Sequence, residues 1–269
     1  MSKSGFIKMT VLVAVCLLGC GGAVVQAADG NGNNNDAGSA CRGLPSQSAL
    51  RAALVAARSQ PNGGFNLDMW GTIVNRDGVV CAVAFTGTAR GDQWPGSRVI
   101  SAQKANTANS FSLKGLALST ANLYTATQPG GSLFGLQLSN PVNTDVAYRG
   151  DPQDNGQSDD PMVGGRIGGV NVFGGGFALY NAQKQIIGGL GVSGDSSCAD
   201  HNIGWRTRNN LKLDNVPAGV SGDTSRPDNI VYDIVTQQGF AIGVSPSGWG
   251  HPACSPAATS IAASLPVVR

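Results

Sequence analysis

The feature that most restricts the fold of this chain is a set of short apolar runs joined by tight turns. Alternating residues from position 65 end at the turn Asn75–Gly78, and a second apolar run follows from Val79 to Phe85, a pattern typical of a β-hairpin. Similar short runs recur at 132–138, 170–173, 177–180 and 185–192. Because tight turns join antiparallel strands and parallel strands need long crossovers, the pattern predicts an antiparallel α+β sheet of about five strands.

Helical periodicity separates these runs. Apolar residues recur every three to four positions from Leu50 to Ala57, between a helix start at Pro45–Ser46 and a stop at Gln60–Pro61. Three further helices are expected: one from Ser97 to Phe111, one over 119–127, and one that begins at Ser196 or Ser197 and carries Ile203, Trp205 and Leu211. We expect the helices to lie mainly on one face of the sheet.

The first 27 residues have the three parts of an export signal. Residues 1–8 are basic, residues 9–20 are apolar, and Val25–Ala27 contains the small residues of a cleavage site. A second interpretation is a lipoprotein signal that ends at Cys20, which would leave the protein anchored through a lipid on that cysteine. Both interpretations predict an exported protein, periplasmic or extracellular. No later run is long enough to predict a transmembrane segment.

Composition divides the rest of the chain into three parts. Residues 28–40 are rich in glycine and asparagine, which predicts a flexible tether. A folded domain is expected over 41–215, and the Gly/Pro/Ser-rich residues 216–269 are expected to wrap around it. Within the domain, 140–169 is a long polar stretch without periodicity. A loop of that length in a compact domain usually has a function of its own, such as that of a lid.

The charges and acidic residues exclude several kinds of partner and site. The chain has 18 basic side chains, of which Lys3 and Lys8 fall in the export signal, and 16 acidic side chains. The exported part therefore has no net charge, and no nucleic-acid partner is expected. Every acidic residue is Asp, because the sequence contains no Glu, which excludes mechanisms that need a glutamate base or metal ligand.

Four cysteines follow the export signal: Cys41, Cys81, Cys198 and Cys254. An even number of cysteines in an oxidising compartment predicts disulfide bonds, and four cysteines allow three connectivities. We favour Cys41–Cys81 and Cys198–Cys254 by position, because each bond then attaches an appendage to the domain.

The segment Gly189–Gly194 matches the pattern GxGxxG between a predicted strand and a predicted helix. It allows a dinucleotide site, although the flanking strands form hairpins rather than βαβ units. The alternative is that these glycines permit close backbone packing and a turn. A serine hydrolase has less support, because GxSxG fails at Asp195 and only His201 and His251 could act as base.

Of the two histidines, His201 is the better candidate for an iron ligand. Asp200 precedes it, and a helix start would present it beside a glycine-rich strand end. A histidine at such a position can equally cap the helix or bond a carbonyl group.

Three ordered motifs between residues 50 and 211 resemble the haem-binding GlcG/HbpS-like family, which includes the C-terminal domain of PduO-type proteins. Residues 97–108 read SRVISAQKANTA and resemble the family helix S-x-x-I-A-x-x-K-A-x-T-A. Residues 188–194 read GGLGVSG, are followed by Asp200, and resemble the family strand end G-A-I-G-V-S-G. The hairpin 73–80 is similar to the element V-V-D-x-x-G-x-L. The chain departs from the family at Asn75, over 86–92 and at Phe177, positions expected near the pocket rim.

The resemblance implies a profilin-like α+β fold, homo-oligomerisation and haem binding, with haem degradation or iron handling in secreted members. We therefore expect an exported protein that sequesters or carries haem and that is a candidate for haem degradation. His201 is the candidate axial ligand on chemical grounds. Lys104, Arg98 and Arg90 are candidate partners of the haem propionates, and Trp94 is a candidate surface for the macrocycle.

A second hypothesis comes from a different class of protein. The glycine-rich turn 188–194 and Lys104 could bind an anionic substrate at a helix N-terminus in an enzyme or accessory protein of small-molecule catabolism. Whether the protein is an enzyme stays open at this point, and so does a purely structural oligomer.

Overall fold

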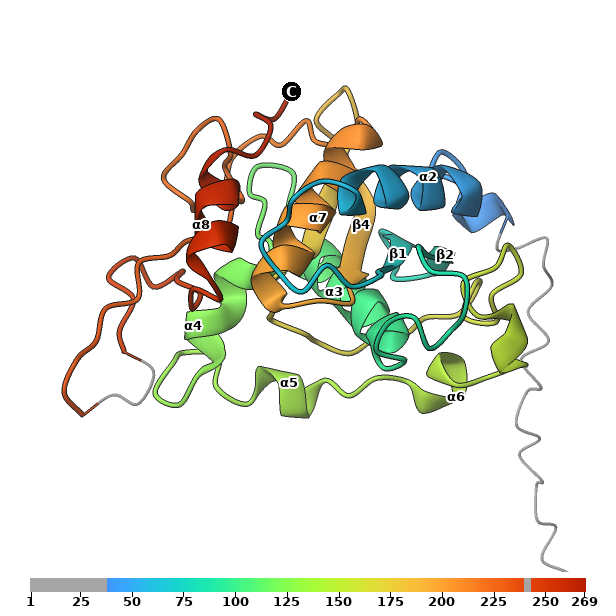
Figure 1. Ribbon diagram of the computed structural model, residues 1–269, viewed down its shortest axis with the longest axis horizontal. Coiled ribbons are helices and arrows are strands. Elements are labelled where there is room, and N and C mark those ends of the chain that lie inside the picture. Colours follow the sequence, from blue (N-terminus) through green and yellow to red (C-terminus); the bar gives the residue numbers. More distant parts are fainter. Residues whose placement is uncertain (1–37, 240–242) are drawn as a thin grey trace, which may run out of the picture. The chain divides into compact units, whose positions relative to one another are not determined.

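The computed structural model describes residues 38–239 and 243–269, which belong to one compact unit (Figure 1). The export signal, Cys20 and all but the last three residues of the predicted tether lie outside the described residues. Those three residues, 38–40, are helical, and the Ala40 carbonyl accepts a hydrogen bond from Asn75 Nδ2 at 2.9 Å. The described end of the tether is therefore attached to the domain.

One antiparallel sheet of four strands forms the centre of the domain. The strands occur in the order β2-β1-β4-β3 across the sheet and are β1 (Trp70–Asn75), β2 (Val80–Phe85), β3 (Gly176–Tyr180) and β4 (Ile186–Ser193). The predicted hairpin is β1–β2, and its turn is closed by the Asn75 side chain, which accepts hydrogen bonds from the Asp77 and Val79 amides. The α+β antiparallel fold is confirmed.

Two of the six apolar runs considered as strands do not join this sheet. Residues 132–138 form turns and the start of the short helix α5 (Leu136–Ser139). None of residues 132–138 is buried, and Leu138 is 86% exposed. The run therefore has no buried apolar face of the kind that a strand in this sheet would have. Residues 170–173 run beside helix α3 instead of pairing in the sheet, because the Asn171 amide donates to Thr107 Oγ1. The sheet therefore has four strands rather than five.

Helices cover both faces of the sheet, which corrects the expectation of one covered face. Helix α3 (Ser97–Phe111) packs on one face against Trp70, Val74 and Val83. Helices α2 (Gln47–Arg58) and α7 (Ser197–Asn210) pack on the other face. The physical reason is that all six residues of β1 are buried, so apolar surface on both sides of the strand requires a cover.

Shorter helical elements follow the connections. They are η1 (Thr120–Leu123), α4 (Tyr124–Thr127), α6 (Thr144–Ala147), η2 (Pro152–Asp154) and α8 (Pro256–Ala263). The predicted helix 119–127 is observed as η1 followed by α4. Helix α8 was not expected from the sequence, although Ser255 caps it by accepting from the Ala258 amide and Pro256 occupies its first position.

The glycines of the GxGxxG pattern serve packing. A side chain on Gly191 would overlap the Ser101 carbonyl oxygen, and one on Gly189 would overlap the Ala105 carbonyl oxygen. Helix α3 thus rests directly on the backbone of β4. Because β4 lies antiparallel between β1 and β3, the βαβ unit that a dinucleotide site requires is missing, and the packing interpretation is correct.

Two disulfides attach the ends of the described chain to the domain. Cys41 is bonded to Cys81 of β2, and Cys198 of α7 is bonded to Cys254. The predicted pairing is confirmed. Among the described residues, no helix combines the length and apolar character needed to cross a bilayer.

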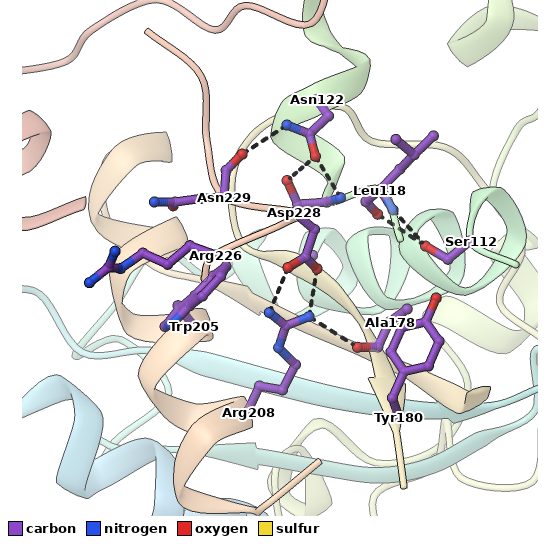
Figure 2. A network of polar contacts seen from close by, with 12 residues as sticks. Ser112, Leu118, Asn122, Ala178, Tyr180, Trp205, Arg208, Arg226, Asp228 and Asn229 are labelled. Carbon is purple, nitrogen blue, oxygen red and sulfur yellow. Dashed lines mark hydrogen bonds and ion pairs between the residues drawn. The ribbon is translucent and has the colours of Figure 1, made fainter. Parts of the chain in front are cut away.

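The C-terminal segment contributes to the core. Arg208 of α7 donates to both carboxylate oxygens of Asp228, at 2.6 and 2.8 Å, and both side chains are fully buried (Figure 2). The Arg208 guanidinium also stacks over Phe177 and Trp205. Residues after 215 therefore supply a buried charge to the domain rather than only covering its surface.

Candidate ligand cleft

A cleft of about 840 Å³ opens beside the β1–β2 hairpin and the first turn of α3. We call it the α3 cleft. Trp70, Phe85 and Val99 supply its apolar surface, and each is less than 9% exposed. The other lining residues are Thr88, Ala89, Arg90, Gly91, Pro95, Arg98, Tyr148, Pro152, Gln153, Asn155 and Gln157. A volume of this size lies within the range of about 300–1,000 Å³ that is usual for small-molecule and cofactor sites.

Two segments singled out in the sequence form the walls of the α3 cleft. Residues 88–91 fall within the segment 86–92 that departs from the family motif, and residues 148–157 fall within the long polar stretch 140–169. The structure thus brings both segments to one site, whereas Asn75 and Phe177, the other two departures from the family motifs, do not line the cleft. It also explains how the polar stretch is held in place.

A buried ion pair attaches the polar stretch to α3. Arg98 donates from Nε and Nη2 to the two carboxylate oxygens of Asp160, at 2.9 and 2.5 Å, and from Nη1 to the Ala147 carbonyl at 2.9 Å. Asp160 also accepts from the amides of Gly156 and Met162. Arg98 lines the cleft, but each of its three guanidinium nitrogens already donates a hydrogen bond and its charge is paired with Asp160, so its main role is to hold this wall.

Arg90 is the candidate propionate partner that the structure leaves available. It is exposed and lines the α3 cleft, and within 38–239 and 243–269 its guanidinium has no hydrogen bond or ion pair. Trp94 is 53% exposed and does not line the cleft. Its proposed role as a surface for the macrocycle therefore has no support from its position.

Lys104 is buried away from the cleft. Its ammonium donates to Asp200 Oδ2 at 2.7 Å and to the Val192 carbonyl at 3.1 Å. Burial raises the pKa of Asp200 to about 6, and the neighbouring Lys104 charge opposes that rise. Because this pair connects α3, β4 and α7 in the interior, Lys104 is not available to a propionate or to another anionic ligand.

His201 is fully buried and does not line the α3 cleft. Its Nε2 forms a hydrogen bond with the Asn229 side-chain oxygen at 3.0 Å, and its ring lies against Phe177 at 4.8 Å between centroids. Its Nδ1 has no partner in the described structure. Burial lowers the pKa of His201 to about 3, so the ring is a neutral core group. His201 therefore belongs to the core and contributes no surface to the cleft.

The other histidine forms a contact that the sequence does not reveal. Ser197, at the start of α7, forms a hydrogen bond with His251 Nε2 at 2.8 Å, while His251 Nδ1 bonds the Pro252 carbonyl at 2.7 Å. The Gly174 amide donates to the same serine oxygen at 2.8 Å. The adjacent Cys198–Cys254 bond holds this contact in place. Burial lowers the pKa of His251 to about 4.

Because of these two histidines, we expect the folded protein to lose stability in mild acid. The unfolded chain binds protons on both rings near pH 6.5, whereas the native rings do so only near pH 3 and 4, so unfolding is favoured as the pH falls from 6.5 to 4. Asp200 acts in the opposite direction, since its native form keeps a proton up to about pH 6. We expect the net effect near pH 5 to correspond to about one proton, so that stability falls by roughly 1 kcal/mol per pH unit.

Urea unfolding between pH 4.5 and 7 measures this slope. His251→Gln removes one titrating ring, and the slope near pH 5 should then approach zero because His201 and Asp200 oppose each other. An unchanged slope in the His251→Gln variant would contradict the assignment.

The sequence did not identify the three aromatic residues of the cleft, which are Trp70, Phe85 and Tyr148. Trp70 and Phe85 are directly opposite each other in the β1–β2 register, with ring centroids 4.9 Å apart. The alternation of the predicted hairpin could have shown this aromatic pair. Tyr148 had one weaker signal, because it is the only aromatic residue in the polar stretch 140–169.

A family model described as "Haem degrading protein HbpS-like" matches residues 46–206, which is more than half of the chain. The chain belongs to the HbpS-like family. The match confirms the resemblance seen in the helix 97–108 and the strand end 188–194. A comparison with curated protein sequences finds no significant match.

Similar solved structures include PduOC in complex with haem, the Klebsiella pneumoniae protein ORFY and HbpS. PduOC is 23% identical over 61% of this chain and 89% of that chain, with a TM-score of 0.42. ORFY is 23% identical over 62% and 90%, with a TM-score of 0.41. HbpS is 16% identical over 61% and 86%, with a TM-score of 0.38.

Proposed function

We propose that this protein binds haem in the α3 cleft. The observation that carries the proposal is the character of the cleft in a member of the HbpS-like family. An apolar surface formed by Trp70, Phe85 and Val99 suits a flat macrocycle, and the unpaired guanidinium of Arg90 suits a propionate. Bound haem supplies an iron centre, and the chain supplies the apolar surface, a cation and the exclusion of water.

An exported location fits this proposal. The two disulfides are of the kind that persists in an oxidising compartment, and we propose that the protein sequesters or carries haem in the periplasm or outside the cell. Assembly into a homo-oligomer, which the family resemblance implies, is part of the same proposal. Light scattering of the purified protein with and without haem measures the oligomeric state.

Titration with hemin tests the proposed site. The wild-type protein should give a shifted Soret band that saturates. Ala89→Trp, which places a large side chain in the cleft, should abolish that saturable binding while leaving the circular dichroism spectrum unchanged. Saturable binding that is unaffected by Ala89→Trp would exclude the α3 cleft, and an absence of binding by the wild type would exclude the function.

Arg90→Ala tests the propionate contact. An exposed charge pair contributes about 1 kcal/mol, so haem affinity should fall roughly fivefold. Arg51→Ala is the matched control, because Arg51 is also exposed and has no ion pair with any residue that the structure describes, but it lies on α2 and does not line the cleft. Equal affinities of the two variants would show that Arg90 does not contact the ligand.

The haem complex of the wild-type protein can be used to distinguish haem carriage from haem degradation. We propose degradation as the finer alternative, since the family description names it. Adding ascorbate in air to the complex supplies reductant and oxygen, and a progressive loss of haem absorbance that Ala89→Trp prevents would support degradation. The hypothesis of an anionic substrate at Lys104 has no favouring observation, because Asp200 already neutralises that ammonium.

A further inference from the structure

We propose that Tyr148 is the axial ligand of the iron, bound through its phenolate oxygen. This inference rests on the proposed function, because it concerns haem in the α3 cleft. It differs from the sequence-based choice of His201, which the fold places in the core.

The first argument for Tyr148 is the composition of the cleft wall. Axial ligands of haem iron in proteins are His, Cys, Met or Tyr side chains. Of these four residue types, the lining of the α3 cleft contains only Tyr148. Thr88 is the one aliphatic alcohol there, and its hydroxyl already donates to Asp92 Oδ2 at 3.1 Å. An alcohol is also a poorer iron ligand than a phenolate.

The other iron-binding side chains are committed elsewhere in the described residues. His201 and His251 are both buried and hydrogen-bonded outside the cleft. The four described cysteines form disulfides. Met69 and Met162 are fully buried in separate core clusters. The other described tyrosines, Tyr124, Tyr180 and Tyr232, do not line the cleft. Among the described residues, Tyr148 is therefore the axial-ligand side chain that the cleft lining itself presents.

The backbone on each side of Tyr148 is fixed. The Ala147 carbonyl accepts from Arg98, which is paired with Asp160 in the interior. On the other side, Arg149 donates from Nε to the Pro161 carbonyl at 2.6 Å and from Nη2 to the Val163 carbonyl at 3.2 Å. Tyr148 is thus presented from an anchored segment, although the segment has little regular secondary structure.

A close contact with the cleft floor completes this anchoring. Gly156 has φ +80°, and a side chain there would overlap the ring of Phe85. The Gly156 carbonyl accepts from Gln47 Nε2 at 2.7 Å, which connects the segment to α2. The loop that bears Tyr148 therefore packs directly on an aromatic residue of the cleft.

The Tyr148 side chain itself is free to bind. It is 71% exposed, and its hydroxyl has no hydrogen-bond partner among residues 38–239 and 243–269. An exposed aromatic side chain in the cleft lining, with its backbone fixed and its hydroxyl unpartnered, can turn toward a ligand without breaking a hydrogen bond.

Charge favours the anionic form of the ligand. The phenolic oxygen bonds ferric iron as the phenolate, so Tyr148 releases its proton to solvent as the bond forms. The phenolate then neutralises one positive charge of the ferric haem. The Arg90 guanidinium lines the same cleft without a carboxylate partner and stabilises the negative charge of a propionate or of this ligand. Binding should therefore release one proton, which makes haem affinity depend on pH.

Tyr148→Phe is the direct test, because it removes only the hydroxyl group. Wild-type protein loaded with ferric haem should show the resonance Raman modes of an iron-bound phenolate. Its haem affinity should rise by up to tenfold per pH unit between pH 6 and 8. In Tyr148→Phe the phenolate modes should be lost, affinity at pH 8 should fall at least tenfold, and the pH dependence should flatten. Tyr124→Phe, outside the cleft, should match the wild type in all three.

Tyr148→His gives an independent measurement that does not depend on loss of binding. If position 148 faces the iron, the imidazole should bind it and convert the spectrum to that of histidine-ligated haem. An unchanged phenolate spectrum in this variant would overturn the inference.

The outcomes separate the inference from the function on which it rests. A wild-type protein that does not bind haem contradicts the proposed function. A wild-type protein that binds haem in the α3 cleft, with a spectrum and affinity unchanged by Tyr148→Phe, contradicts only the choice of ligand. A spectrum lost in His201→Ala and kept in Tyr148→Phe would assign the iron to His201.

Discussion

Asp228→Ala is expected to lower the free energy of unfolding by about 3–5 kcal/mol, because it leaves the Arg208 guanidinium buried without its counter-charge. Both side chains are fully buried, and the two hydrogen bonds between them are 2.6 and 2.8 Å long. Figure 2 shows this pair beside Trp205, with a further bond from Arg208 to the Ala178 carbonyl of β3. Urea unfolding monitored by tryptophan fluorescence measures the loss.

Asp223→Ala is the matched control for that variant. Asp223 also pairs with an arginine of the C-terminal segment, Arg226, but its side chain is 44% exposed. Exposed pairs contribute between about 0 and 1 kcal/mol, so this variant should stay near the wild type. The double variant R208M/D228L should recover most of the stability, since an apolar replacement of a buried pair is often neutral. A loss of under 1 kcal/mol in Asp228→Ala would show that the segment does not belong to the core.

Gly191→Ala should destabilise the domain by about 3 kcal/mol or more. The added methyl group would overlap the Ser101 carbonyl oxygen of α3 and would also lie 2.5 Å from the Ala105 amide nitrogen. Both obstacles are backbone atoms of a helix, which cannot turn aside as a side chain can, so α3 must move off the sheet. Overpacking usually costs about 1–3 kcal/mol, and a rigid obstacle places this site at the upper end or beyond.

The effect should extend to the α3 cleft, because Arg98 and Val99 on α3 form part of its lining. Hemin titration of any Gly191→Ala protein that folds should therefore show weakened binding. Gly115→Ala is the control for this variant. Gly115 has no atom near the position of an added side chain, and its replacement should change stability by no more than about 0.5 kcal/mol. Equal stability of the two variants would contradict direct contact between α3 and β4.

Local patterns were sufficient for much of the fold. The turn Asn75–Gly78 with its flanking alternation predicted the β1–β2 hairpin, and the periodicity of Leu50, Leu54 and Ala57 predicted α2. These signals are reliable because turn chemistry and the apolar stripe of a helix act between residues that are close in sequence. The cysteine pairing was also anticipated, although from position along the chain alone.

The surroundings of the candidate site residues could not be predicted from the sequence, for a reason visible in the charged ones. Lys104 and Arg98 lie on helix α3. The sequence identifies both as cations but does not show which carboxylate pairs with each of them. Their carboxylates, Asp200 and Asp160, lie 96 and 62 residues away, so only the folded chain reveals that both charges are already neutralised. The burial of His201 was hidden for the same reason, since its hydrogen-bond partner Asn229 lies 28 residues away.

By itself, the sequence determined the antiparallel α+β class, the hairpin, the principal helices and the family to which the chain belongs, because all of these depend on short-range patterns. Only the tertiary structure decided which cations are free, that both faces of the sheet are covered, and that Trp70, Phe85 and Tyr148 meet at one cleft. Those outcomes depend on contacts between residues distant in sequence, and the energy of burying or pairing a side chain is set by neighbours that no local pattern contains.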